Sequence, residues 1–212
     1  MKLHLGCGQR YIKGYVNIDF PQSEHTVQEK SVADIQTNIL DLKYQKGSIE
    51  EVRLHHLFEH FTRPIAFALL SAWNNWLNDN GILHIEVPDL YKTASIIFNP
   101  FKSFNKKMIA TRHIFGSHEA SWAIHCEGWT TKSLKIVLES YGFKVIKILK
   151  NKWRGTYNFE IISQKIKTLN NDELLQTTES LLKNYLLSFN DEKKLFYTWL
   201  DMYKNQLNKN LN

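Results

Sequence analysis

Two kinds of hydrophobic pattern take turns along this sequence. Short runs with alternating or continuous apolar residues predict β-strands, and stretches whose apolar residues recur every three or four positions predict amphipathic helices. The predicted strands are residues 2–5, 15–18, 32–35, 51–55, 82–87, 143–149 and 157–163. The predicted helices are residues 62–80, 90–110 with a break at Asn99-Pro100, and 131–141. The alternation predicts an α/β fold, in which a mostly parallel sheet with helices on both faces ends in an antiparallel strand pair.

The predicted helix over residues 62–80 has recognisable ends. Thr62 and Pro64 mark its start, because proline is tolerated in the first turn of a helix. The Asn80-Gly81 pair is typical of a helix C-cap. A continuous apolar strand follows at once, which places the helix between two strands of the sheet.

The pattern changes from about residue 166. Two amphipathic helices are predicted there, over residues 172–188 and 191–208. We therefore expect a main domain over residues 1–165 and a helical extension over residues 166–212. An apolar stripe left exposed on these helices would invite association. The extension is expected to pack against the domain or to form a homodimer.

A glycine turn lies between the first two predicted strands, and an acidic residue closes the second. Gly6 and Gly8 would let the backbone approach a ligand where a Cβ atom would clash. Asp19, at the tip of the second strand, is placed to accept hydrogen bonds from a ribose diol. No third glycine opens a phosphate-binding helix, and Asp19 follows Gly6 sooner than the roughly 20 residues expected of an NAD site. The pattern favours a nucleoside ligand without a pyrophosphate.

Three segments of the sequence resemble those of a known protein family. They are the run Leu5-Gly6-Cys7-Gly8, the Gly-Tyr-Val-Asn-x-Asp strand that follows it, and the segment from Asn80-Gly81 to Val87-Pro88-Asp89. Over about residues 2–165 they resemble class I S-adenosylmethionine (SAM)-dependent methyltransferases, in particular a bacterial group often associated with surface-polysaccharide genes. The resemblance implies a Rossmann-like sheet, SAM as cofactor and S-adenosylhomocysteine as product. The cofactor residues that it implies are Gly6, Cys7, Gly8, Asp19, Asp41, Leu42 and His56. Asp41 would accept from the adenine amine, or is simply a loop cap.

The segment His56-Leu-Phe-Glu59-His60 matches the H-x-x-E-H motif of inverzincin zinc proteases. That motif belongs on a long helix, whereas Pro64 follows almost at once here, so these residues read as a loop after a strand. The methyltransferase resemblance places them beside the transferable methyl group, where some relatives bind a divalent metal. In the alternative interpretation, the two histidines and Glu59 only bind one another and fix the loop.

Residues 112–129 are irregular and dense in His, Trp and Gly, which is typical of a functional loop. His125 is the preferred general base, because a histidine near neutral pKa can take the proton of a hydroxyl. A metal held by His56, Glu59, His60 and His125 would instead lower the pKa of that hydroxyl. The residues expected to contact the acceptor are Arg112, His113, Trp122 and Trp129. In one alternative, this segment is only an ordinary ordered loop. In another, both tryptophans belong to the core.

Composition adds the charge distribution and the compartment. The formal net charge is +6, yet residues 101–167 alone hold 13 Lys and Arg against 4 Asp and Glu. Such segregation suits an anionic partner, although a basic face often only solvates itself. Two cysteines make no disulfide framework. No apolar run approaches the roughly 20 residues of a membrane span, and no signal peptide precedes the first strand, so a cytoplasmic protein is expected.

The function predicted from these features is SAM-dependent O-methylation of a hydroxyl on an anionic carbohydrate-like or nucleotide-linked small molecule. One alternative is a SAM-binding or nucleoside-binding module without catalysis. Another is a nucleic-acid methyltransferase, which only the basic stretch favours. No Asn-Pro-Pro-Tyr type of amino-methylating motif follows the fourth strand, where His-Leu-Phe-Glu-His stands instead. Oxygen is therefore the expected acceptor atom, and nucleic acid an unlikely substrate.

Overall fold

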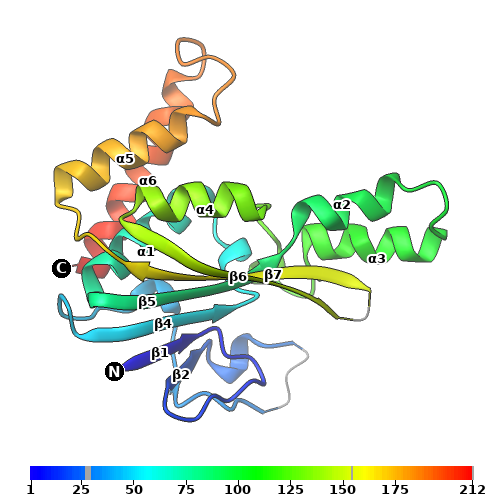
Figure 1. Ribbon diagram of the computed structural model, residues 1–212, viewed down its shortest axis with the longest axis horizontal. Coiled ribbons are helices and arrows are strands. Elements are labelled where there is room, and N and C mark those ends of the chain that lie inside the picture. The colour runs from blue at the N-terminus through cyan, green and yellow to red at the C-terminus, as the bar shows by residue number, and fades with distance from the viewer. Residues whose placement is uncertain (27–29, 154, 212) are drawn as a thin grey trace.

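The computed structural model describes residues 1–26, 30–153 and 155–211, and this part of the chain forms one seven-stranded sheet (Figure 1). The strand order is β3-β2-β1-β4-β5-β7-β6. β7 runs antiparallel to both β5 and β6, and the other neighbours are parallel. The strands are β1 (Lys2–Leu5), β2 (Val16–Asp19), β3 (Ile35–Gln36), β4 (Ile49–His55), β5 (Leu77–Pro88), β6 (Phe143–Trp153) and β7 (Thr156–Lys165). The predicted α/β class with an antiparallel end is confirmed.

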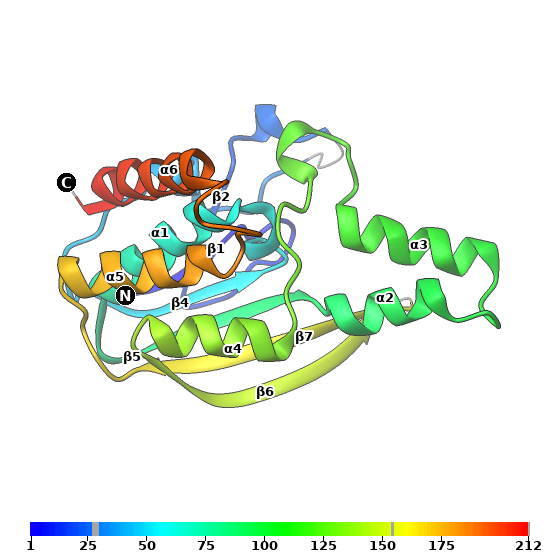
Figure 2. The same ribbon diagram turned by 90° about the horizontal axis from the view of Figure 1, so that it is seen from above.

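The alternation predicted helices on both faces of the sheet. The helices of the described residues instead cover only one face. Four of them, α1, α4, α5 and α6, lie on one face, and α2 and α3 form a hairpin beyond the sheet (Figures 1 and 2). The helices are α1 (Arg63–Trp76), α2 (Leu90–Phe98), α3 (Phe104–Phe115), α4 (Thr131–Ser140), α5 (Asn171–Lys183) and α6 (Lys193–Leu211). The described connections between β1 and β4 contain only short 3-10 turns, so nothing there can form a second helical layer.

The side chains of the strands follow this one-sided arrangement. Residues that face the helices are apolar and fully buried, such as Leu3, Val52 and Ile85. The next residues along the strands point to the opposite face and are polar, because side chains alternate along a strand. His4, Asn17, His55, His84 and Glu86 lie on that face. These side chains are buried, so their polar atoms need hydrogen-bond partners within the protein.

Several element boundaries differ from the expected ones. α1 ends at Trp76, and β5 already begins at Leu77, so the Asn80-Gly81 pair lies inside the strand and is not a C-cap. Leu77 is fully buried and pairs with Ile49, and this burial outweighs the local turn preference of Asn-Gly. α3 continues to Phe115, four residues into the segment predicted to be irregular.

The C-terminal helices pack on the main domain. Tyr203 of α6 shares a hydrogen bond with Ser71 of α1 (3.0 Å between the oxygens), and the Tyr141 hydroxyl lies 2.6 Å from that of Thr178 in α5. The apolar face of α6, with Phe196, Leu200 and Tyr203, is buried. Association is therefore not needed to cover these stripes, and a homodimer stays a prediction.

Four side chains on the helix-free face form a hydrogen-bonded row. Arg53, which can only donate, gives its Nε–H to His55 Nε2 at 3.1 Å. His55 must then donate from Nδ1 to His4 Nε2 (3.0 Å), and His4 donates from Nδ1 to Asn17 Oδ1 (3.0 Å). Both imidazoles are therefore neutral. Burial, with Arg10 and Arg53 nearby, lowers the pKa of His55 to about 3.

This row makes the fold sensitive to acid. Between pH 6.5 and about 3, the unfolded chain protonates His55 and the folded chain does not, so the free energy of unfolding falls as the pH falls through this window. We expect a loss of about 2 kcal/mol between pH 6.5 and 5 from His55 alone. Urea unfolding at both pH values measures it. His55→Gln keeps polar atoms but cannot titrate, so its pH dependence should be smaller by that amount; equal pH dependence in both proteins would contradict the assignment.

Candidate functional site

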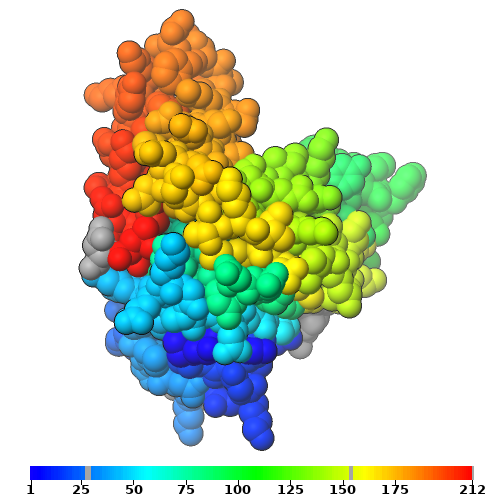
Figure 3. Space-filling view, turned by 60° about the vertical axis from the view of Figure 1, so that its left-hand side comes forward, coloured from blue at the N-terminus to red at the C-terminus, as the bar shows by residue number. Residues whose placement is uncertain are grey.

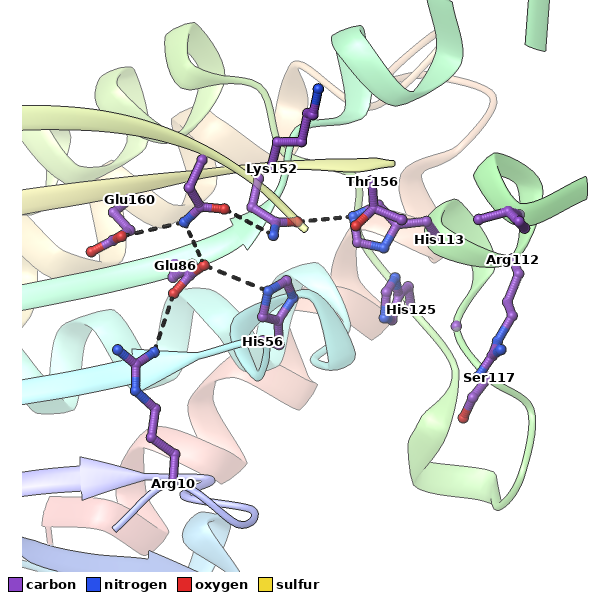
Figure 4. A pocket seen from close by; sticks show the side chains of 14 residues that line it. Arg10, His56, Glu86, Arg112, His113, Ser117, His125, Lys152, Thr156 and Glu160 are labelled. Carbon is purple, nitrogen blue, oxygen red and sulfur yellow. Dashed lines mark hydrogen bonds and ion pairs between the residues drawn. The ribbon is translucent and has the colours of Figure 1, made fainter. Parts of the chain in front are cut away.

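A cavity of about 900 Å³ lies at the carboxyl ends of β4 and β5, beside the start of β7 and the last turn of α3. Figure 4 shows Arg10 and His56 reaching Glu86 on one side, and His113 and His125 on the other. Ligands of open α/β sheets bind at this edge. The location of the cavity therefore makes it the candidate site.

The glycine turn after β1 positions Asp19. Gly6 and Gly8 both have positive φ angles, +64° and +53°. A Cβ atom on Gly6 would approach the Leu57 side chain to 3.0 Å, whereas one on Gly8 would point into open space. The Gly8 N–H donates to Asp19 Oδ2 (2.6 Å), and the Phe20 N–H donates to Oδ1 (2.8 Å). The structure thus brings Gly6, Gly8 and Asp19 together, with open space beside Gly8.

Cys7, between the two glycines, is buried, with its thiol 3.9 Å from Asp19 Oδ2. Burial and the neighbouring Asp19 carboxylate raise the pKa of this thiol to about 12. Cys7 is therefore a protonated thiol at neutral pH, and it serves the turn through its small, buried side chain.

Asp41 and Leu42 do not reach the cavity. Asp41 ends the 3-10 turn Ile39–Asp41, and its carboxylate forms an ion pair with Lys209 of α6. The carbonyl of Leu42 accepts a hydrogen bond from Asn210 at 2.9 Å. The adenine contact of this pair stays a prediction, and both residues also contact a helix that the motif could not show.

His56 lies between two carboxylates. Its backbone has a positive φ of 49°, and its Nδ1 and Nε2 lie 3.3 Å from Glu59 Oε1 and 3.7 Å from Glu86 Oε1. Burial disfavours the charged imidazole, but these two carboxylates outweigh it and raise the pKa of His56 to about 10. His56 is therefore a cation at neutral pH. His56 is also not among the residues whose ligand atoms cluster, which are Glu59, His60 and His125.

Glu59 and His60, in the 3-10 turn Phe58–His60, form a tight cluster with His125. The three offer ligand atoms that all lie within 4.8 Å of one another. Glu59 is 1% exposed, and neither oxygen accepts a well-formed hydrogen bond from a described residue. His60 Nδ1 lies 3.1 Å from the carbonyl oxygen of Ile124, which leaves Nε2 free to bind. A buried carboxylate and two imidazoles are a donor set that divalent transition metals accept.

His125 is also suited to be a base. Burial lowers the pKa of His125, although the Glu59 carboxylate, 3.9 Å away, opposes that effect. The imidazole is therefore neutral near pH 7. It lines the cavity, where a bound hydroxyl can reach it.

The four predicted acceptor residues separate into two pairs. Arg112 and His113 of α3 line the cavity, and His113 Nε2 is 2.9 Å from Asn158 Oδ1. Trp122 instead donates its indole N–H to the Glu24 carbonyl (2.9 Å), which attaches the loop to the segment after β2. Trp129 is 1% exposed and stacks on Phe58, with ring centroids 5.3 Å apart. The tryptophans are therefore structural, and their predicted contact with the acceptor is corrected.

No protein-family model and no curated protein matches this sequence significantly. Solved structures do match. A SAM-dependent methyltransferase from Methanosarcina mazei aligns with a TM-score of 0.52 at 16% identity, covering 78% of this chain and 92% of that one. Another from Archaeoglobus fulgidus aligns with a TM-score of 0.50 at 16% identity, covering 77% and 85%. The chain has the class I methyltransferase fold.

Two regions of this methyltransferase fold were expected at the cavity edge. The glycine turn with Asp19 and the loop after β4 both lie at the carboxyl ends of strands, as the resemblance implied. At 16% identity, the likeness shows the fold alone. The association with surface-polysaccharide genes stays a prediction.

Sequence reasoning missed several charged residues of the site, among them Glu86 and Arg10. Glu86 carries an ionised carboxylate: burial opposes this, but His56 and Asn151 lower the pKa of Glu86 to about 2. Arg10 Nη1 lies 3.7 Å from Glu86 Oε2. A carboxylate inside the apolar run 82–87 was a usable signal for Glu86. Arg10 follows the glycine turn in a polar loop and had none.

Proposed function

We propose that this chain is a SAM-dependent methyltransferase that methylates a hydroxyl group on an anionic, carbohydrate-like or nucleotide-linked small molecule. The observation that carries the proposal is the Glu59–His60–His125 cluster at a cavity on the carboxyl edge of a class I methyltransferase sheet. The glycine turn and Asp19 lie at the same edge and offer a nucleoside its ribose contact.

Different residues of the site would bind the ligands and transfer the proton. Asp19 would bind the ribose hydroxyls, and Gly8 leaves room for the ligand. Bound SAM supplies a sulfonium-activated methyl group. His125 would accept the proton of the acceptor hydroxyl, which raises the nucleophilicity of that oxygen toward the methyl group. The cavity walls hold the two reactants in line, and such alignment contributes much of the rate of a displacement.

A divalent metal is a second way to activate the hydroxyl. Glu59, His60 and His125 would hold it through one carboxylate oxygen and two imidazole nitrogens, and it would lower the pKa of the hydroxyl. The buried, poorly hydrogen-bonded Glu59 carboxylate favours this version. Elemental analysis of the purified protein, with activity in excess chelator, separates the two. Full activity in chelator leaves only the general-base version.

The charge of the acceptor follows from the cavity and its surroundings. Residues 101–167 hold 13 Lys and Arg against 4 Asp and Glu, and Arg112 from this segment lines the cavity. A guanidinium binds phosphate through two parallel hydrogen bonds. Comparing a phosphorylated acceptor with its neutral form over a range of salt concentrations tests this part. Equal turnover of both, without salt dependence, would refute it.

Asp19→Ala should weaken the binding of SAM and S-adenosylhomocysteine by about 1.5–3 kcal/mol, the range for a hydrogen bond to a charged group. Isothermal titration calorimetry measures both affinities, and a thermal melt checks that the glycine turn is still folded. Asp41→Ala is the matched control: because Asp41 faces α6, its affinity should stay near that of the native protein. Native protein that binds NAD tightly and gives no heat with either ligand would overturn the cofactor assignment.

A further inference from the structure

The α2–α3 hairpin, residues 90–115, stands apart from the rest of the molecule. Both ribbon views show it extending beyond the sheet, and the space-filling view shows its green surface projecting from the body (Figures 1, 2 and 3). It is attached at one end only, where Asp89 caps α2 and Gly116 ends α3. Its free end is the connection between the two helices, residues 99–103.

Large aromatic side chains are exposed at that free end. Phe98, Phe101 and Phe104 are 82%, 95% and 76% exposed. Tyr91 on α2 and Phe115 on α3 are exposed as well. A soluble surface rarely gathers this many exposed aromatic residues without using them.

Three of the exposed apolar residues of α3 form a stripe with basic flanks. At about 100° per residue, Phe104, Met108 and Phe115 point within about 40° of one another. On the same scale, Lys107 lies about 60° to one side of Phe104 and Arg112 about 80° to the other. An apolar stripe between two basic edges is the pattern of a helix that lies in a membrane interface.

The charge of the hairpin has one sign. Residues 90–118 contain no Asp or Glu. The basic residues of this stretch are Lys92, Lys102, Lys106, Lys107 and Arg112. Phenylalanine supplies hydrophobic insertion, and lysine near a negatively charged surface adds electrostatic attraction.

We infer that the α2–α3 hairpin docks on anionic phospholipid membranes, with the phenylalanines of its free end inserted among the headgroups. A protein partner fits the composition less well, because the centres of protein interfaces are depleted in lysine. Spanning is not involved: no helix within residues 1–26, 30–153 and 155–211 has the length and hydropathy to cross a bilayer.

Docking has a consequence for the cavity. Arg112 and His113 lie on the same helix as Phe104, eight and nine residues further on, or about 12 Å along the axis. A hairpin seated on a membrane therefore holds the cavity close to the headgroups. The inference does not depend on the proposed methyl transfer, because vesicle binding is measured without cofactor or acceptor.

Co-sedimentation of the full chain with vesicles tests the inference. We expect binding to phosphatidylcholine vesicles that contain about one-third phosphatidylglycerol, little binding to phosphatidylcholine alone, and weaker binding at high salt. The triple variant Phe98→Ser, Phe101→Ser, Phe104→Ser should lower the partition coefficient at least about tenfold. Lys102→Glu with Lys106→Glu should do the same on anionic vesicles.

Two variants elsewhere serve as matched controls. Leu187 is 97% exposed in the connection between α5 and α6, so Leu187→Ser removes an equally exposed apolar side chain. Lys193→Glu with Lys194→Glu changes the charge as much as the hairpin double variant does. Both controls should bind vesicles like the native chain. Native protein that stays in the supernatant with anionic vesicles would overturn the inference, as would hairpin variants that bind no worse than the controls. Light scattering that shows the triple variant converting a dimer into a monomer, with no vesicle binding by the native chain, would assign the surface to a second copy instead.

Discussion

The variant His125→Ala should transfer methyl groups about 10²–10⁴ times more slowly than the native protein, the usual contribution of a positioned general base. Its affinity for SAM should change less than twofold, because the proposed SAM contacts come from the glycine turn and Asp19 and not from His125. This outcome would separate an enzyme from a binding module without catalysis, in which the substitution changes nothing measurable.

The pH profile gives this experiment a second readout. Burial lowers the pKa of His125 below 6.5, so the neutral base prevails from there upward. The native kcat should therefore reach its plateau at a lower pH than an ordinary histidine would give, and fall only in more acidic solution. The remaining activity of His125→Ala should lack that acidic limb. His118→Ala, in the same loop but outside the cavity wall, is the matched control. A similar loss in both variants would remove His125 from the mechanism.

Deleting residues 168–212 should give insoluble protein. The two C-terminal helices cover α1, where Ser71 loses its partner Tyr203 and Arg63 loses the aromatic rings of Tyr185 and Trp199 that lie over its guanidinium. The newly exposed apolar surface would then drive association. Expression followed by size-exclusion chromatography measures the result. A soluble, folded fragment of residues 1–167 would show that the extension is an independent unit.

A single substitution measures how much the packing of α6 on the main domain contributes to stability. Leu200→Ala should lower the free energy of unfolding by about 2–5 kcal/mol, because it removes buried methyl groups and leaves a cavity. That is a large part of the roughly 5–15 kcal/mol that stabilises a typical domain. Leu187→Ala, at an exposed position, should have no measurable effect in the same urea titration. Equal midpoints for all three proteins would show that α6 contributes little.

The sequence predicted what depends on neighbours along the chain. The glycine turn and the strand that runs from it to Asp19 depend only on local backbone geometry and period-two alternation. Both appear where expected. The start of α1 next to Pro64 is local in the same sense. Local signals also misled at Asn80-Gly81, because pairing of Leu77 with the distant Ile49 decided that boundary.

The electrostatics of the site could not be read in this way. His56 belongs to a motif of bases and metal ligands, yet Glu86, on the next strand of the sheet, helps to make it a cation. Trp129 belongs to a loop rich in functional residue types, yet stacking on Phe58 places it in the core. In both cases, the decisive partner is a residue that only the folded chain brings near.

The contact between α6 and the segment before β4 has a consequence for folding during synthesis on the ribosome. Gln206 and Asn210 donate to the carbonyl of Leu40, and Asn210 also donates to that of Leu42, across 166 to 170 residues of sequence. During synthesis, that segment leaves the exit tunnel long before α6 has been translated. Contacts of such long range form slowly, because the closure of a large loop is entropically costly. The first four strands therefore remain incompletely covered for most of the translation time. A chaperone would bind the chain during this interval.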